Sequence, residues 1–178
     1  MATPHITEVF SMNSYFFDNF RKMISTLLSA SWGLDHLIFS VLGIIVSAYA
    51  LHVEDRKHKD PKYVAMCDFN EHMSCSKVLT SEYSQGFGLT QFLVGKEHFL
   101  NIPNCILGII FYGLQLVLGF YTANPWCATL LFYSSIVSTI GSLYLAYVLF
   151  VILKDICIVC IATYIVNFAL LYLNYALL

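Results

Sequence analysis

Four long stretches without a charged side chain constrain this fold more than any other feature of the sequence. None of them contains Lys, Arg, Asp or Glu, and they cover residues 37–53, 103–121, 126–153 and 156–178. A Lys, Arg or Asp at the centre of a membrane helix costs roughly 2.5 to 3.5 kcal/mol on insertion scales, so four such runs indicate four spans. About 20 apolar residues cross a bilayer. We therefore predict an all-α membrane protein, a four-transmembrane-helix bundle.

The composition agrees with a protein that lies in a lipid bilayer. Of the 178 residues, 58% are hydrophobic and only 11% are charged, and the formal net charge is -2. A chain with this charge and no basic run does not suit a nucleic-acid surface. We predict one membrane domain, residues 37–178, after an N-terminal extension, residues 1–36. The aromatic and charged residues of the extension suit an interfacial helix, and a disordered extension is the alternative.

The connections between the predicted spans differ greatly in length. Residues 54–102 form one long polar loop between helices 1 and 2, whereas residues 122–125 and the pair Lys154-Asp155 are tight turns. Four spans place the long loop and Lys154-Asp155 on the same side of the membrane. The lysines of the loop favour the cytosolic side under the positive-inside rule. We nevertheless predict the lumenal side, because two loop cysteines suit an oxidising compartment.

Four of the six cysteines are predicted to converge on that side. Cys67 and Cys75, here called the loop pair, lie in the long loop. Cys157 and Cys160, here called the helix pair, form a CxxC motif at the start of the fourth run. This spacing places both sulfurs on one helix face, and the helix dipole favours the thiolate there. One thiol can attack and the other resolve, while the second dithiol completes an electron relay.

Each pair also has an alternative interpretation. The loop pair can be a plain structural disulfide, since closing about nine residues stabilises a fold by roughly 2.6 kcal/mol in the chain-entropy estimate. The helix pair can be two small buried apolar residues. A zinc site made of all four sulfurs suits the edge of a bilayer poorly, and we predict no metal. Cys105 and Cys127 are predicted to be packing residues.

Two polar residues are candidates for binding a ligand near the CxxC motif. Tyr164 lies one turn after Cys160 on the same helix face, followed by Asn167. Polar groups at membrane depth normally face the interior, which predicts a cavity lined by Cys160 and Tyr164, although bonds between helices are the alternative. Asn104 begins the second run after Pro103. Its amide is predicted either to cap that helix or to donate to a ligand oxygen.

An apolar segment interrupts the polar loop. It contains Gly86-Phe87-Gly88-Leu89 and continues through residues 92–94, Phe-Leu-Val. Such a segment can dip into the membrane interface and close over an apolar substrate, with the glycines as hinges. Packing within the loop itself is the alternative.

Taken together, these motifs resemble the vitamin K epoxide reductase family, in its animal form and close to the reductase-like paralogue. The resemblance runs from about residue 40 to 174 and rests on Cys67-Asp68, Cys75-Ser76, Gly86-Phe87-Gly88-Leu89, Leu100-Asn101 with Asn104, Phe111-Tyr112, Gly141-Ser142 and Cys157-Ile158-Val159-Cys160 with Thr163-Tyr164. It implies a helical bundle around a quinone pocket in the endoplasmic reticulum membrane. It also implies reduction of vitamin K epoxide to quinone and hydroquinone, and inhibition by warfarin-type compounds.

The resemblance also implies a role for each cysteine. Cys160 would attack the substrate, and Cys157 would resolve the adduct. Cys75 would exchange with Cys157, and Cys67 would receive electrons from a thioredoxin-like lumenal partner. No bound cofactor is implied, since the quinone or epoxide is the substrate and a thiol is the reductant.

The resemblance further implies a substrate pocket. Asn104 and Tyr164 would bond the oxygens of the substrate, and the remaining predicted pocket residues are Phe87, Tyr83, Leu79, Leu107, Phe111, Tyr112 and Val159. Three of these depart from the reductase pattern. Tyr83 stands in place of a tryptophan, and Leu79 and Leu107 stand in place of phenylalanines. These departures bear on substrate affinity and on sensitivity to the inhibitors.

Two rival functions fit parts of the same pattern. A quinone-linked oxidase that forms disulfides would use the same four cysteines with the opposite direction of electron flow. A non-enzymatic tetraspan adhesion protein would also carry paired cysteines in a large loop, but the membrane-edge CxxC motif argues against it. Turnover of a quinone or an epoxide with a dithiol separates the enzyme from the adhesion protein.

Overall fold

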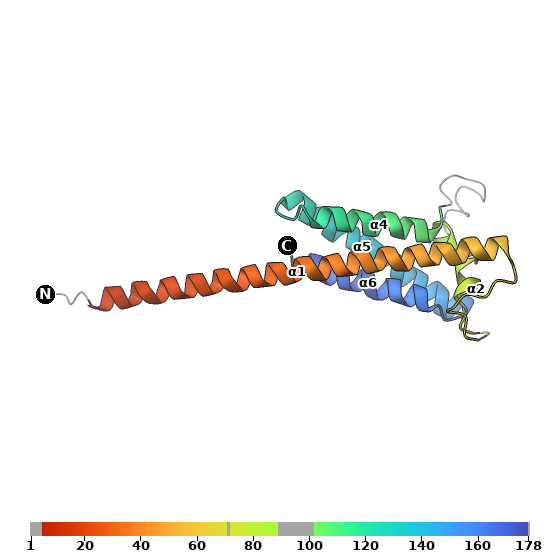
Figure 1. The fold of residues 1–178 in the computed structure, drawn as a ribbon, viewed down its shortest axis with the longest axis horizontal. Coiled ribbons are helices and arrows are strands. Elements are labelled where there is room, and N and C mark those ends of the chain that lie inside the picture. Colours follow the sequence, from red (N-terminus) through yellow and green to blue (C-terminus); the bar gives the residue numbers. More distant parts are fainter. Residues whose placement is uncertain (1–4, 71, 89–101, 178) are drawn as a thin grey trace. The chain divides into compact units, whose positions relative to one another are not determined.

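The computed structural model is mostly helical and contains no strand in the residues it describes, which are 5–70, 72–88 and 102–177, with side chains from residue 32 onward. The chain divides into two compact units, Met1–Asp35 and His36–Leu178. Its elements, labelled in Figure 1, are α1 (His5–Lys59), α2 (Cys75–Leu79), η1 (Glu82–Ser84), η2 (Gly86–Gly88), α4 (Asn104–Gly119), α5 (Pro125–Tyr147), η3 (Val148–Leu153) and α6 (Ile158–Tyr175). Within the second unit, α4, α5 and α6 lie beside the His36–Lys59 part of α1, and α2 lies at one end.

Among the described residues, three helical segments are long and apolar enough to cross a membrane. They are Trp32–Lys59, Pro125–Leu153 and Ile158–Tyr175. The second predicted run also forms a helix, but α4 has only 16 residues. At about 1.5 Å per residue it is about 24 Å long, shorter than the roughly 30 Å hydrocarbon core. The fourth span therefore stays a prediction.

We expected the first apolar helix to end at residue 53, but α1 continues to Lys59. Its last turns are charged and still helical. The Lys59 Nζ atom donates to Asp55 Oδ2 at 2.7 Å across one turn. The final turn is basic, which complements the partial negative charge at a helix C-terminus. Glu54 and Asp55 therefore lie within the helix and do not mark its end.

Small residues allow α1 and α4 to approach closely. The ring of Tyr112, only 2% exposed, occupies the space that a Cβ atom on Gly43 would need. Likewise, Ser47 Oγ on α1 lies 2.7 Å from the position that a Cβ atom on Gly108 of α4 would take. Glycine at both positions is a common way for membrane helices to pack.

Buried polar side chains connect the helices at the end that is remote from α2. Gln115 on α4 is fully buried, and its Oε1 atom accepts hydrogen bonds from His36 at 3.2 Å and from Asn174 at 2.9 Å. The Asn174 amide also donates to Ser135 Oγ on α5 at 2.7 Å. Interhelical hydrogen bonds of this kind in membrane proteins contribute on average about 0.6 kcal/mol each. They link α1, α4, α5 and α6.

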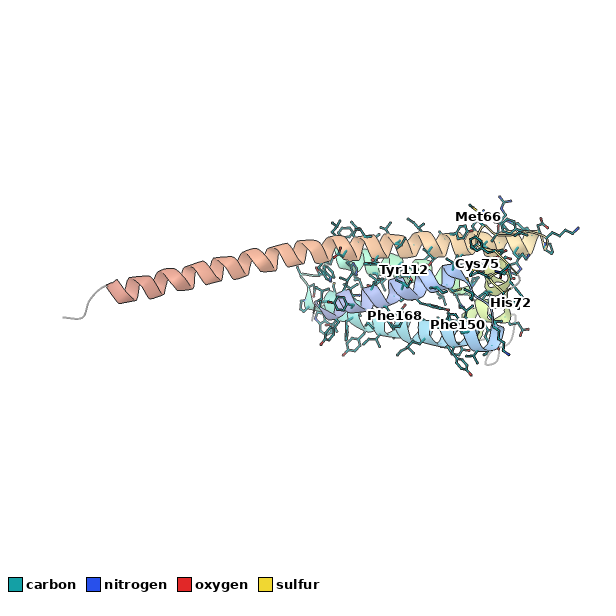
Figure 2. The ribbon with its side chains drawn as sticks, turned by 90° about the horizontal axis from the view of Figure 1, so that it is seen from below. Met66, His72, Cys75, Tyr112, Phe150 and Phe168 are labelled. Atoms are coloured by element: carbon teal, nitrogen blue, oxygen red, sulfur yellow. The ribbon has the colours of Figure 1, made fainter. Side chains whose placement is uncertain are left out.

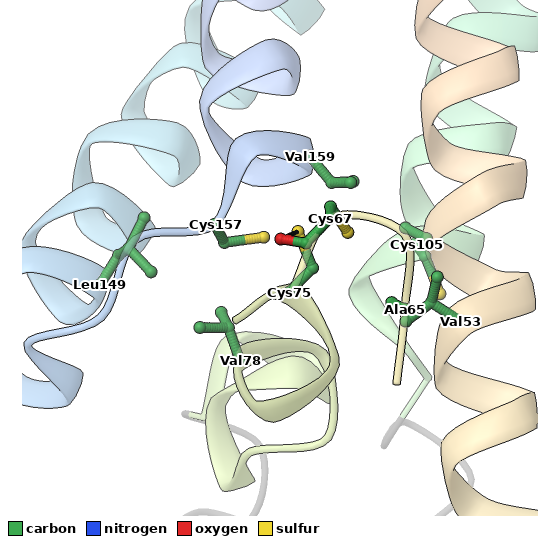
Figure 3. Packing of buried hydrophobic residues seen from close by; sticks show 10 residues of the cluster. Val53, Ala65, Cys67, Cys75, Val78, Cys105, Leu149, Cys157 and Val159 are labelled. Carbon is green, nitrogen blue, oxygen red and sulfur yellow. Dashed lines mark hydrogen bonds between the residues drawn. The ribbon is translucent and has the colours of Figure 1, made fainter. Parts of the chain in front are cut away.

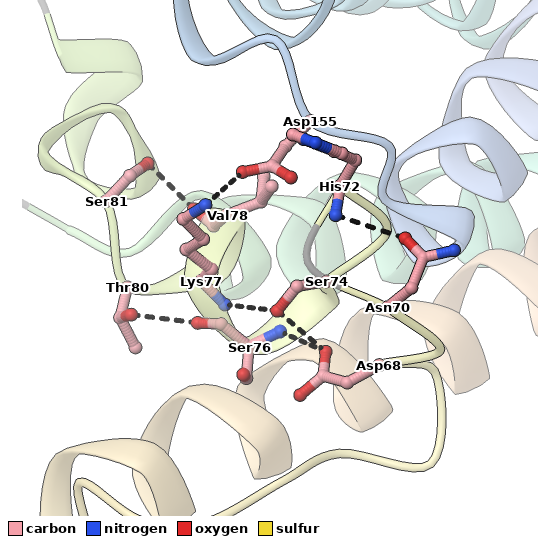
Figure 4. A network of polar contacts seen from close by, with 10 residues as sticks. All are labelled: Asp68, Asn70, His72, Ser74, Ser76, Lys77, Val78, Thr80, Ser81 and Asp155. Atoms are coloured by element: carbon pink, nitrogen blue, oxygen red, sulfur yellow. Dashed lines mark hydrogen bonds and ion pairs between the residues drawn. The ribbon is translucent and has the colours of Figure 1, made fainter.

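The connection between α5 and α6 lies against the long loop, as predicted from the parity of the spans. Helix α5 continues into the π-helical segment η3, and Lys154 ends it in the left-handed conformation with φ of 53°. Beyond it, Ile156 N donates to His72 O at 3.0 Å, and Lys77 Nζ pairs with Asp155 Oδ2 at 3.0 Å (Figure 4). The loop is thereby fixed beside the start of α6.

Candidate active site

Asp68 organises the loop segment that carries Cys67 and Cys75. Its Oδ1 atom accepts from Ser76 N at 2.9 Å and from Ser74 Oγ at 3.1 Å (Figure 4). Its Oδ2 atom accepts from Ala65 N at 2.9 Å. Burial alone would raise the pKa of Asp68, but these hydrogen bonds outweigh it and the pKa is lowered. The ionised carboxylate therefore stabilises the turn that leads into α2.

The two loop thiols are buried and protonated. Cys67 is 8% exposed and Cys75 is 0% exposed. The Tyr49 hydroxyl donates to Cys67 Sγ at 3.8 Å, and Cys75 Sγ donates to the Cys67 carbonyl oxygen at 3.7 Å. Burial raises the pKa of Cys67 to about 12. The pKa of Cys75 is also raised, chiefly by its hydrogen bond with Cys157 and further by burial.

The helix pair lies at the first turn of α6. Cys157 is the N-cap residue, and its Sγ atom accepts a hydrogen bond from Cys160 N at 3.3 Å. The Cys157 side chain is fully buried, whereas Cys160 is half-buried. Helix α6 thus begins after Cys157, two residues later than the apolar run from which it was predicted. The predicted motif at a helix start is present.

The four thiols follow one another in space in the order Cys67, Cys75, Cys157, Cys160. The thiol of Cys75 interacts with those of both Cys67 and Cys157, and the thiol of Cys157 interacts with that of Cys160. Figure 3 shows Cys67, Cys75 and Cys157 gathered where the loop meets α6. All four are free thiols. Because thiol-disulfide exchange requires sulfur to reach sulfur, this row provides three successive exchange contacts.

A cavity of about 550 Å³ begins where this row ends. Its volume lies within the range of about 300 to 1,000 Å³ that is typical of ligand sites. Of the four cysteines in the row, only Cys160 lines it. Every residue predicted for the substrate pocket also lines it: Leu79, Tyr83, Phe87, Asn104, Leu107, Phe111, Tyr112, Val159 and Tyr164. The structure brings these residues together, and their roles toward a ligand stay predictions.

The helix-capping role predicted for Asn104 is wrong, and its role toward a ligand stays a prediction. The N-cap residue of α4 is Pro103, without a side-chain cap. The Asn104 Nδ2 atom donates to Tyr83 O at 2.7 Å, and its Oδ1 atom accepts from Phe87 N at 2.9 Å. An amide has two N–H groups, so one donor remains for a ligand in the cavity. Asn104 therefore holds the loop segment over the cavity that it lines.

The glycines around Phe87 are required by the backbone. Gly86, Phe87 and Gly88 have φ values of 52°, 58° and 72°, the left-handed region that favours glycine. This turn places the Phe87 ring beside Gly141 of α5. A Cβ atom added to Gly141 would lie 3.1 Å from Phe87 Cε1. The rest of the predicted lid, Leu89 and residues 92–94, lies outside the described residues.

Polar groups from three helices form part of the cavity wall. The Tyr112 hydroxyl donates to Asn167 Oδ1 at 2.8 Å, and Asn167 Nδ2 donates to Ser142 Oγ at 2.7 Å. The alternative prediction of bonds between helices is therefore confirmed for Asn167. Figure 2 shows Tyr112 among the helices, while Cys75 lies near the end that carries α2.

Glu54 and Cys105 belong to the cavity wall, and the sequence interpretation missed them. Glu54 is 4% exposed, and Cys105 Sγ on α4 donates to its Oε2 atom at 3.0 Å. Glu54 was assigned to the end of a span, and Cys105 to packing. The helical spacing of Ser47, Ala50 and Glu54, which all line the cavity, is the signal that would have indicated this face.

One group in the loop has the side chains of a metal site. Cys67, Asp68 and Cys75 each present a ligand atom within 4.8 Å of the others. Both oxygens of Asp68 already accept hydrogen bonds from Ala65, Ser74 and Ser76.

Apolar helices and a row of thiols that ends at a mostly apolar cavity define a membrane thiol oxidoreductase. Comparison with known proteins supports this class. Residues 36–175 match the model of the vitamin K epoxide reductase family. The chain is 44% identical over 143 residues to vitamin K epoxide reductase complex subunit 1 of Mus musculus, covering 80% of this chain and 88% of the relative. It is 43% identical to the Rattus norvegicus protein of the same name over 139 residues, 78% and 86% of the two chains. The chain belongs to the vitamin K epoxide reductase family, a family of enzymes.

Proposed function

We propose that this protein reduces vitamin K epoxide to the quinone, and the quinone to the hydroquinone, with electrons from its four thiols. The observation that carries the proposal is the row of thiols that ends with Cys160 in the wall of the cavity. The cavity wall is mostly apolar, which suits a lipid-like ring and side chain. The names of the Mus musculus and Rattus norvegicus relatives support this choice of substrate.

The proposed chemistry begins with a bond from Cys160 to the substrate. The thiolate of Cys160 attacks a ring carbon of the epoxide, the C–O bond opens, and the oxygen takes a proton. Cys157 then attacks the Cys160 sulfur, the C–S bond breaks, and its electron pair returns to the ring as hydroxide leaves and is protonated to water. The sum is epoxide and two thiols to quinone, disulfide and water. A second dithiol oxidation converts quinone to hydroquinone.

Asn104 and Tyr164 would hold the oxygens on which negative charge develops. Both line the cavity that Cys160 also lines. Asn104 keeps one N–H group after its bond to Tyr83, and that bond restrains the amide before substrate binds.

The loop pair would deliver the electrons. Cys75 lies against Cys157, and Cys67 is the outermost thiol of the row. A lumenal thioredoxin-like protein is the proposed donor to Cys67. Three apolar side chains near Cys67 are exposed and suit such a partner: Val64 at 69%, Met66 at 88% and Phe69 at 66%. Since Cys67 itself is 8% exposed, the loop must open for exchange with the partner.

We also propose the topology and location of the protein. Helix α4 would cross the endoplasmic reticulum membrane together with the three longer helical segments. The loop and the helix pair would then face the lumen, where thioredoxin-like proteins exchange disulfides. Warfarin-type inhibitors would occupy the same cavity as the substrate.

One turnover assay tests both the proposed activity and the direction of electron flow. Purified protein in detergent, supplied with a small dithiol, is expected to convert vitamin K epoxide to quinone and hydroquinone. Cys127→Ser is the matched control, because Cys127 is neither in the row nor in the cavity wall, and it should keep full activity. An enzyme that turns over neither compound with a dithiol, but oxidises protein thiols with quinone, would show the disulfide-forming oxidase instead.

A further inference from the structure

Glu54 is an ionisable side chain in an otherwise mostly apolar cavity wall. It is 4% exposed and lines the cavity together with Ala50 and Cys105. Burying a charged carboxylate is costly unless it is paired, so such a group tends to take up a proton and become neutral. Its neighbour Asp55 differs, because that side chain is 52% exposed and pairs with Lys59. The two acidic residues are therefore adjacent in sequence, but the Glu54 side chain is buried and the Asp55 side chain is exposed.

The contacts of Glu54 connect the cavity with the outside. Its Oε2 atom accepts from Cys105 Sγ at 3.0 Å, and its Oε1 atom lies 4.0 Å from His58 Nε2. The His58 side chain is 57% exposed, one helical turn further along α1. Among the described residues, His58 on α1 and Cys105 on α4 are the titratable groups that act on Glu54.

We propose that Glu54 is the proton donor of the cavity, and that His58 returns protons to it from solvent. The inference rests on the proposed function, because it assigns the protons that quinone-type chemistry consumes. The described row of thiols supplies electrons, and Cys160 must lose its own proton before it attacks. A buried carboxylic acid that faces the same cavity is a chemically suitable source for the oxygen.

The proton balance follows from the steps above. When the thiolate of Cys160 opens the epoxide, the oxygen takes the Glu54 proton and leaves a carboxylate. His58 transfers a proton to that carboxylate and takes up another from solvent, which also receives the protons that the Cys160 and Cys157 thiols release. During formation of hydroquinone, Glu54 protonates one ring oxygen in the same way, solvent protonates the other, and both electrons come from the dithiol. Over each cycle Glu54 and His58 regain their initial states.

The test compares Glu54→Gln with Asp55→Asn over a range of pH, using vitamin K epoxide and a small dithiol. General acid catalysis typically contributes about 10²- to 10⁴-fold, so Glu54→Gln should lower kcat by about 10²-fold or more with little change in KM. The alkaline fall of the wild-type kcat, where the acid loses its proton, should disappear in this variant. Asp55→Asn should match wild type.

A second pair of variants separates proton transfer from folding. Glu54→Asp keeps an acid and should retain more activity than Glu54→Gln, whereas His58→Asn should slow turnover in a way that small buffer acids partly restore. Melting temperatures of the variants report on folding. Equal kcat and pH profiles for wild type and Glu54→Gln would overturn the proposal. Wild-type protein without any turnover would instead contradict the proposed function itself.

Discussion

The backbone N–H of Cys160 donates to the sulfur of Cys157 at 3.3 Å, and this bond orients the buried thiol toward its partner in the motif. The helix pair is thereby arranged for exchange within one turn of α6. Only Cys160 of the two lines the cavity, which supports the proposal that Cys160 attacks and Cys157 resolves.

Cys160→Ser should abolish turnover with any reductant, because a hydroxyl is not a comparable nucleophile near neutral pH. Cys157→Ser should also stop turnover, but after the first bond has formed. We expect a covalent adduct between Cys160 and the substrate in this second variant, detected by mass spectrometry of the intact protein. Substantial activity of folded Cys160→Ser protein would refute the assignment.

Asn104→Ala should weaken binding of substrate and warfarin-type inhibitors by about 1 to 3 kcal/mol, through loss of a donor in a dry pocket. The variant also frees Tyr83 O and Phe87 N, which the amide now binds. Inhibitor titration measures the effect. Asn104→Asp retains the acceptor for Phe87 and removes the N–H groups, so it should lose affinity as well. Unchanged affinity in both variants would leave Asn104 only the role of holding the loop.

Asp68 should make the loop sensitive to acid. Its pKa in the folded protein is lowered by its hydrogen bonds, so its stabilising effect is complete above the unfolded value of about 3.9 and is lost as the pH falls through the folded value. Asp68→Asn should destabilise the loop by about 1 to 3 kcal/mol near neutral pH, with little further loss in acid. Protease susceptibility of the loop against pH checks this. Identical acid profiles for the two proteins would contradict it.

Cys75→Ser should separate the relay from a structural disulfide. We expect this variant to lose activity that is driven by a thioredoxin-like partner, yet to keep appreciable activity with a small membrane-permeant dithiol that reduces the helix pair directly. If both activities fell together with the melting temperature, the loop pair would be a structural staple. If neither fell, the loop pair would lie outside the electron path.

The helices and the cysteine pairs were predictable because they depend on local sequence. Long runs without charge specify apolar helices, and the CxxC spacing fixes two thiols within one turn. The pocket residues followed from the family resemblance, which places Leu79 and Tyr83 of the loop beside Val159 of α6. The short length of α4 was not expected, because hydropathy continues past its last helical residue, Gly119.

The contacts that depend on tertiary packing could not be predicted. Because helix α1 continues past residue 53, Glu54 lies on the helix face that lines the cavity and contacts Cys105. The two bonds of Asn104 require Tyr83 and Phe87 to come back over α4 after a turn with positive φ. The raised pKa of Cys67 follows from burial under the folded loop, which no spacing in the sequence indicates.

In the proposed mechanism both pairs of thiols pass electrons to one cavity, and the stoichiometry of quinone reduction tests this delivery most directly. Fully reduced protein, free of reductant and oxygen, is mixed with excess quinone, and hydroquinone is counted per chain. Four thiols form two disulfides, and the formation of each disulfide releases the two electrons of one hydroquinone. We expect two equivalents for wild type and one for Cys75→Ser. A single equivalent from wild-type protein would show that the loop pair does not feed the cavity.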